Sequence, residues 1–165
     1  MIRIPTLRLG EENESLDLIE VKDCRTGEVL AEVSQGNGGI VRRDLSRHLD
    51  KARAALKKFK VSELVEISKK AGELFMNATL PCGNVMQSPE DYVKTLSRTS
   101  GLPYNMCRAN MGKVYEVMAD ITTILKGLTR SLDLTVLDKG CIVQDGVGIS
   151  YACDTNSLGV VLPSN

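Results

Sequence analysis

The sequence predicts an α/β fold, in which an N-terminal β-hairpin is followed by a layer of helices and then by further strands. Three observations support this order. Residues 28–34 alternate between apolar and polar side chains, as a half-buried strand does. The middle of the chain repeats apolar residues at spacings of three and four, which is the helical period. Beyond residue 140, short β-branched runs flank an Asp-Gly pair.

Composition excludes several classes of function. The chain has 165 residues, 42% of them hydrophobic and 25% charged, which is ordinary for a soluble globular protein. Lys plus Arg and Asp plus Glu number 21 each, so the chain offers no net basic field for nucleic acid. The first residues lack the apolar core of a signal peptide, and no run is long enough to span a membrane. We therefore expect a cytoplasmic protein with no nucleic-acid or membrane partner.

The cysteines predict neither a metal site nor a disulfide framework. No two of them form a Cys-x-x-Cys pair, and the single histidine, His48, has no nearby cysteine. An odd number of cysteines without a secretory signal favours free thiols. The five are Cys24, Cys82, Cys107, Cys141 and Cys153.

The N-terminal third begins with residues 1–16, which are polar and irregular and predict a loose surface arm. Strands at 18–21 and 28–34 follow as a hairpin, in which Gly27 supplies the positive φ of the turn. The glycine-rich loop at 35–39 follows this hairpin and does not match G-x-G-x-x-G. We interpret it as a flexible connector.

Two amphipathic helices are predicted next, over 41–60 and 62–78. Pro81 and Gly83 are expected to end the second helix. The residues expected to face inward recur at helical spacing. In the first helix they are Leu45, Leu49, Ala52, Leu56 and Phe59, and in the second Leu64, Ile67, Ala71, Leu74 and Phe75.

A third helix begins at Ser88-Pro89-Glu90-Asp91, because Ser88 can cap, Pro89 suits the first helical position and Asp91 can reach back. It is expected to end near Gly101. One long helix is then predicted over 103–132, where an apolar stripe runs from Val114 to Leu132. Near its start, Met106 and Met111 are interpreted as core filler.

The C-terminal part returns to strands. Residues 141–144 and 147–150 flank Asp145-Gly146, a strong two-residue hairpin signal. This register places Cys141 opposite Ser150, which leaves Cys153 too far along for a disulfide with Cys141. After a loop, the apolar run at 158–162 predicts a buried strand that ends at Pro163. Such a strand requires cover on both faces, so these elements do not form a closed architecture.

Two segments resemble the aldehyde dehydrogenase superfamily. Gly159-Val160-Val161-Leu162-Pro163-Ser164-Asn165 is similar to the family's Gly-Val-x-x-Pro-Trp-Asn segment, with Ser164 in place of the usual Trp. Arg25-Thr26-Gly27-Glu28-Val29-Leu30-Ala31-Glu32-Val33 is similar to the family's N-terminal Thr-Gly-Glu hairpin. The two matches stand in the family's order, and the resemblance covers roughly residues 18–165.

The resemblance implies an incomplete aldehyde dehydrogenase-type Rossmann-like domain, the first third or so of such an enzyme. Residues 1–140 would be the N-terminal hairpin and helices of the cofactor-binding domain. Residues 141–153 would be a β-hairpin arm for homo-oligomerisation, and 154–165 the first strand of the dinucleotide-binding fold. The implied enzyme is an NAD- or NADP-dependent oxidoreductase that acts on the aldehyde or oxo group of its donor.

The resemblance also assigns roles to the last five residues. Asn165 would stabilise the oxyanion, and Val161, Leu162, Pro163 and Ser164 would line the nicotinamide end of the cofactor groove. The cysteine nucleophile, which forms the thiohemiacetal, and the glutamate base would lie outside this chain. The 165-residue chain alone is therefore expected to be inactive and only marginally stable.

Two alternatives remain open at this point. Ser164 replaces a large indole, which raises the acyl-CoA reductase branch of the same superfamily, with an acyl substrate instead of an aldehyde. From a different class, the long apolar stripe permits a non-catalytic helical interaction module that carries a β-arm.

Overall fold

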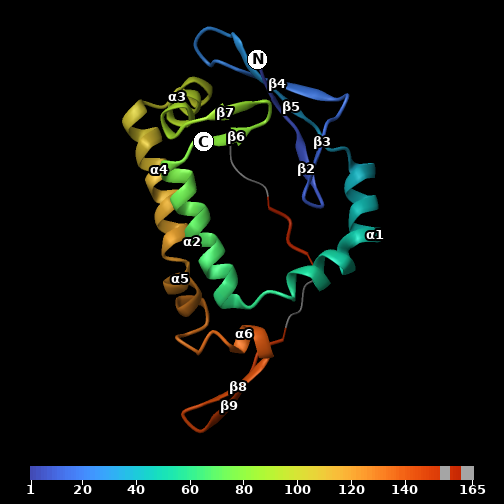
Figure 1. The fold of residues 1–165 in the computed structure, drawn as a ribbon, viewed down its shortest axis with the longest axis vertical. Coiled ribbons are helices and arrows are strands. Elements are labelled where there is room, and N and C mark those ends of the chain that lie inside the picture. The colour runs from blue at the N-terminus through green and yellow to red at the C-terminus, as the bar shows by residue number, and fades with distance from the viewer. Residues whose placement is uncertain (153–156, 161–165) are drawn as a thin grey trace.

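The computed structural model describes residues 1–152 and 157–160 (Figure 1), and within them it has a mixed α/β architecture of small sheets and six helices. The helices are α1 (Gly38–Leu56), α2 (Val61–Asn77), α3 (Pro89–Ser100), α4 (Tyr104–Ala119), α5 (Ile121–Leu128) and α6 (Val136–Lys139). The strands are β1 (Ile2–Ile4), β2 (Thr6–Arg8), β3 (Glu11–Asn13), β4 (Leu18–Lys22), β5 (Val29–Ser34), β6 (Leu80–Cys82), β7 (Val85–Gln87), β8 (Cys141–Gln144) and β9 (Val147–Ser150).

The predicted N-terminal hairpin is confirmed as β4 and β5, and Gly27 has the expected positive φ of 73°. The predicted loose arm at 1–16 is wrong. Strand β1 pairs in parallel with β5, with Ile4 opposite Val33, and β2 pairs with β3 in a hairpin of its own. Each of these strands has three residues, which is too short for a period-2 pattern to be recognised in the sequence.

Helix α1 forms where expected but begins earlier, at Gly38, and ends at Leu56 rather than Lys60. The side chain of Asn37 sets its start by accepting a hydrogen bond from the Ile40 amide at 2.9 Å. The predicted burial of its apolar face is wrong, because no residue of α1 is buried and Leu56 is 58% exposed. In Figure 1, α1 stands apart from α2, α4 and α5.

Helices α2 and α4 pack side by side through a close approach at Gly72. A Cβ at Gly72 would lie 3.0 Å from Cβ of Met118, and Ser68 Oγ donates to the Met118 carbonyl at 3.2 Å. The buried residues of α2 are Val65 and Gly72. The residues predicted to face inward lie on a different side of the helix, so that prediction is wrong. Ile67, expected inside, is 53% exposed.

Helix α3 has the predicted start and end. Ser88 Oγ accepts from the Asp91 amide at 3.2 Å, and the Asp91 carboxylate accepts from the Ser88 amide at 3.2 Å. Gly101 ends the helix in the left-handed conformation. The main apolar core lies between α3 and α4. It comprises Val93, Cys107 and Met111, with Phe75, Met76, Tyr92, Leu96 and Leu102 packed against them.

Pro81 and Gly83 were predicted only to end α2. They lie in the β6–β7 hairpin, which packs against β1. The Asn84 side chain accepts a hydrogen bond from the Arg3 amide at 2.9 Å. Gly83 has a φ of 59°, and a Cβ there would fall 1.6 Å from the Arg3 carbonyl oxygen. Only glycine permits this close approach.

The predicted single helix at 103–132 is wrong, because the chain divides into α4 and α5 at Asp120. Asp120 leaves helical geometry, with φ −103° and ψ 23°, and its carboxylate accepts from the Thr123 hydroxyl at 2.7 Å. Aspartate favours such helix boundaries because its side chain competes for local hydrogen bonds. Met111 is buried as expected, but Met106 is exposed.

The predicted hairpin beyond residue 140 is confirmed as β8 and β9, in the expected register with Cys141 opposite Ser150. Asp145 and Gly146 have positive φ values of 52° and 76°, as a type I′ turn requires. The hairpin projects from the end of the molecule opposite β4 and β5 (Figure 1).

In the part of the chain that the structure describes, no helix combines the length and the hydropathy of a membrane-spanning segment.

Candidate functional site

The residues to which the resemblance assigns roles, Val161, Leu162, Pro163, Ser164 and Asn165, lie outside the described residues, as does Cys153. The structure therefore neither brings them together nor separates them. Residues 157–160, which precede them, have no regular secondary structure, so the predicted strand is wrong over its described part. Leu158 is 86% exposed there. No strand of the described chain pairs with this segment, so its backbone lacks the partner that a strand needs.

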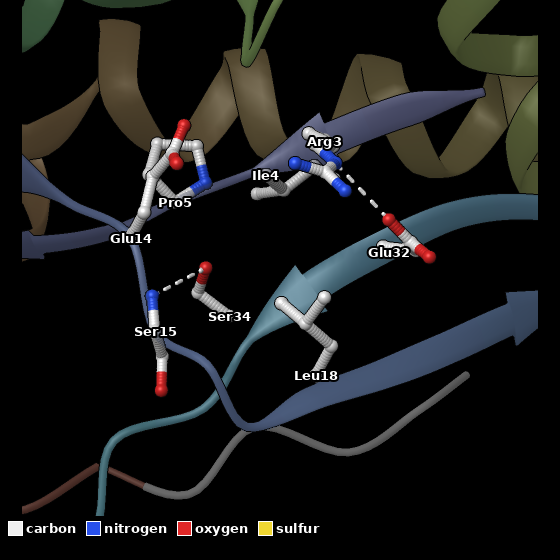
Figure 2. Close-up of a pocket in the computed structure, with 8 residues that line it drawn as sticks. All are labelled: Arg3, Ile4, Pro5, Glu14, Ser15, Leu18, Glu32 and Ser34. Atoms are coloured by element: carbon white, nitrogen blue, oxygen red, sulfur yellow. Dashed lines mark hydrogen bonds and ion pairs between the residues drawn. The ribbon is translucent and has the colours of Figure 1, made fainter.

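A small cavity with both polar and apolar side chains in its wall lies between β1, β5 and the segment that leads into β4 (Figure 2). Its volume is about 30 Å³, enough for about one water molecule. Ser34 Oγ accepts a hydrogen bond from the Ser15 amide at 3.2 Å, and Arg3 Nε donates to Glu32 Oε2 at 3.1 Å. Ligand pockets for small molecules are roughly ten times larger, so this cavity cannot hold a nicotinamide cofactor.

The larger hollows are open grooves on helix or strand surfaces rather than enclosed pockets. One of about 500 Å³ runs along α1 and is lined by Leu9, Leu56 and Phe59 among others. Another of about 470 Å³ lies at the junction of α4 and α5 beside Tyr115 and Asp120. Over the described ranges, no group of His, Cys, Asp and Glu could hold a metal ion.

The described cysteines differ in their exposure: Cys24 and Cys141 are exposed, Cys82 is half-buried and Cys107 is buried. Cys24, Cys82, Cys107 and Cys141 are free thiols. Cys107 is fully buried in the core, where its sulfur lies 3.7 Å from the Leu102 carbonyl oxygen. A substrate has no access to that thiol.

The best-defined electrostatic cluster joins the turn of the β4–β5 hairpin to α3. Asp23 is only 7% exposed, and its carboxylate accepts from Arg98 Nε at 2.7 Å and from the amides of Arg25 and Thr26 at 2.9 and 3.2 Å. Arg98 also donates to Glu28 Oε2 at 2.7 Å. The Arg98 hydrogen bond, helped by these amides, lowers the pKa of Asp23 to about 2.

The backbone reinforces this cluster. The Cys24 amide donates to the Arg98 carbonyl at 2.9 Å, and the Gly27 amide donates to the Asp23 carbonyl at 2.9 Å. Asp23 has thereby engaged its acceptors within the protein, so the cluster is a structural anchor for the Thr26-Gly27-Glu28 turn. The sequence carried a signal for Asp23, because aspartate at the start of a glycine-containing turn caps that turn. It carried none for Arg98, which lies 75 residues away.

A second ion pair fixes the β2–β3 hairpin to α1. Arg8 donates through Nε and Nη2 to both carboxylate oxygens of Asp44, at 2.8 and 2.7 Å. This two-point geometry is the strong form of an arginine–carboxylate contact, and it lowers the pKa of Asp44. The sequence did not indicate this pair.

Comparison with known proteins gives no match to a protein-family model, to a curated protein or to a solved structure.

Proposed function

We propose that these residues are the N-terminal part of an NAD- or NADP-dependent oxidoreductase of the aldehyde dehydrogenase superfamily. The observation that carries the proposal is the order of features along the chain. A Thr-Gly-Glu hairpin comes first, then a helical layer, then a projecting β-hairpin, and last the segment Gly159-Val160-Val161-Leu162-Pro163-Ser164-Asn165. In this proposal the enzyme is cytoplasmic and acts on the aldehyde or oxo group of a small-molecule donor.

The anchored turn supports the proposal from the structural side. The segment that resembles the family hairpin, 25–33, contains a type of turn that needs glycine at Gly27, and Asp23 and Arg98 lock that turn onto α3. The resemblance thus falls on an ordered element of the fold.

The openness of the fold also supports the proposal. The accessible surface is 12099 Å² for a chain of 18.0 kDa, whereas a compact monomer of that mass exposes about 8,000 Å². Large apolar side chains contribute to the exposed surface, including Ile67 and Leu74 of α2 and Val114 and Val117 of α4. Such faces call for further packed polypeptide, as expected for part of a larger domain.

In the proposed enzyme, this chain's contribution to catalysis is Asn165. Its side-chain amide would donate a hydrogen bond to the carbonyl oxygen as that oxygen becomes an anion, and so stabilise the transition state. Val161, Leu162, Pro163 and Ser164 would line the groove beside the nicotinamide. The cofactor would accept a hydride, and the thiol nucleophile and general base would come from residues beyond this chain.

The β8–β9 hairpin would serve as the oligomerisation arm. Val143 and Val147 on it are exposed, and the outer edges of a two-stranded hairpin leave backbone groups free to pair with another chain. Residues 1–140 would then be the N-terminal hairpin and helices of the cofactor-binding domain, residues 141–153 the arm, and residues 154–165 the segment that leads into the dinucleotide-binding fold.

The experiment is to purify the protein encoded by the complete reading frame and to follow nicotinamide absorbance. Oxidation of a panel of aldehydes with NAD or NADP supports the proposal. Reduction of acyl-CoA with NADPH but no aldehyde oxidation assigns it to the acyl-CoA reductase branch, the alternative that the Ser164 substitution raises. Absence of both activities, in a reading frame that stops after Asn165, would favour the non-catalytic interaction module.

A further inference from the structure

Helix α1 and the residues just after it carry a strong local excess of positive charge. Residues 38–60 hold eight lysines and arginines against two aspartates, although the whole chain has 21 charges of each sign. The cations are Arg42, Arg43, Arg47, Lys51, Arg53, Lys57, Lys58 and Lys60. Within the described ranges, no carboxylate forms a salt bridge with Arg42, Lys51, Lys57 or Lys58.

The same helix presents an exposed apolar stripe. Val41, Leu45, Leu49, Ala52 and Leu56 recur at helical spacing and share one face, yet none of them is buried. Two open grooves follow this stripe. One is lined by Val41 and Leu45 together with Arg42, and the other by Leu56 and Phe59 together with Lys51. Cations therefore border the apolar stripe at both grooves.

The tip of the β2–β3 hairpin extends this apolar surface. Leu9 lines the groove beside Leu56 and Phe59 and is 62% exposed. It has a positive φ of 55°, which is unfavourable for a bulky side chain. The two-point contact between Arg8 and Asp44 holds this hairpin against α1. The structure thus keeps a leucine exposed at the tip of a constrained turn.

We propose that this surface, formed by α1, Phe59 and Leu9, binds the anionic face of a lipid bilayer. A helix with low overall hydrophobicity, an apolar stripe and lysines and arginines beside it lies in the interface between lipid headgroups and acyl chains. The headgroup phosphates pair with the cations while the acyl boundary covers the stripe. This mode of binding needs no membrane-spanning helix, and it departs from the expectation of no membrane partner, which rested on the whole sequence rather than on α1.

Charge and polarity distinguish this partner from the other candidates. A second copy of α1 would bring two strongly cationic faces together, and that repulsion opposes pairing. A nucleic acid would neutralise the cations but would leave the apolar stripe in water. An anionic bilayer satisfies both features at once. The inference stands apart from the proposed function, because it uses none of the residues 157–165.

The test is co-sedimentation of the 165-residue protein, and of the protein from the complete reading frame, with two kinds of vesicle. One is pure phosphatidylcholine, and the other contains about one-third phosphatidylglycerol. Both proteins should bind the anionic vesicles at least tenfold more tightly, and added salt should weaken that binding. Equal affinity for both kinds of vesicle would overturn the proposal. The proposal would also fail if the 165-residue protein bound anionic vesicles but the protein from the complete reading frame did not, because the rest of the protein would then cover α1.

Matched variants assign the binding to α1. Replacing Lys51, Lys57 and Lys58 together by Gln should weaken binding to anionic vesicles by about tenfold or more, since each cation near the surface contributes. Replacing Leu45 and Leu56 by Gln should do the same without changing the net charge. The control replaces Lys69, Lys70 and Lys94 by Gln, which removes the same charge from α2 and α3. Circular dichroism verifies folding, and an equal loss in the control would contradict the assignment.

Discussion

Arg98 Nε donates to Asp23 Oδ2 at 2.7 Å and so ties the N-terminal hairpin to α3 across 75 residues of sequence. Arg98 also donates to Glu28 Oε2 at 2.7 Å, and its carbonyl accepts from the Cys24 amide at 2.9 Å. These contacts hold the segment that resembles the aldehyde dehydrogenase hairpin against α3.

We predict that this pair makes stability depend on pH in the acid range. The pKa of Asp23 is about 2 in the folded protein against an ordinary value of 3.8. A lowered folded-state pKa means that the contribution is complete above pH 3.8 and disappears as the pH falls toward 2. Asp23→Asn should lower the urea midpoint at pH 7, and its curve should converge with that of the wild type near pH 2. Asp17→Asn, at an exposed site, is the control, and a constant gap down to pH 2 would contradict the prediction.

Gly83 and Gly146 provide a matched test of the contact between the β6–β7 hairpin and β1. Both have positive φ, but a Cβ at Gly83 would meet the Arg3 carbonyl, whereas one at Gly146 would meet nothing within 4 Å. Gly146→Ala should cost about 1–2 kcal/mol of unfolding free energy from backbone strain alone. Gly83→Ala should cost a further ~1–3 kcal/mol, because backbone must shift. Equal losses in chemical denaturation would show that the close approach does not occur.

Met111 and Met106 test the position of the core on α4. Met111 is 2% exposed and packs with Val93 and Cys107, whereas Met106 is 52% exposed on the same helix. Met111→Ala should therefore cost about 2–5 kcal/mol of unfolding free energy. Met106→Ala should change it by less than about 0.5 kcal/mol. Similar values for the two variants, measured by thermal or urea denaturation, would place the core elsewhere.

The sequence predicted best those elements whose determinants are local. The cap at Ser88 and Asp91, the type I′ turn at Asp145-Gly146 and the turn at Gly27 each depend on a few neighbouring residues, and each was predicted correctly. The pairing of β1 with β5 depends instead on residues about 30 positions apart, and strands of three residues carry no usable period. The buried face of α2 was misjudged because Gly72, which has no side chain, makes the close contact with α4.

The same distinction between local and long-range determinants applies to the candidate site. Its motif residues could be named from the sequence, because Gly159–Asn165 forms a contiguous segment that resembles a known family. Its anchor could not, because Asp23 and Arg98 meet only in the folded chain. The exposure of the apolar face of α1 could not be predicted either, because helical periodicity predicts an apolar face but not whether another element covers it.

The β8–β9 arm should hold copies of the protein together. Light scattering should give the mass of a dimer or larger species. Ile142 and Ile149 face each other across the hairpin, so replacing both by Pro removes two backbone donors and disrupts both strands. That variant should be monomeric. Asp145→Asn keeps a residue suited to the type I′ turn and should retain the oligomer. An unchanged mass in the double-proline variant would show that the arm is not the interface.

The most direct test of the central claim is steady-state kinetics of Asn165→Ala in the protein from the complete reading frame. If Asn165 donates to the oxyanion, kcat should fall about 10²–10³-fold, because one preorganised donor typically contributes that much. Cofactor affinity, measured by titration, should stay nearly unchanged, and Asn165→Asp should be at least as impaired because a carboxylate repels the oxyanion. Asn105→Ala, on α4, is the matched control. A kcat within about threefold of wild type, or a collapse of cofactor binding instead, would contradict the assignment of Asn165 and with it the proposed enzyme class.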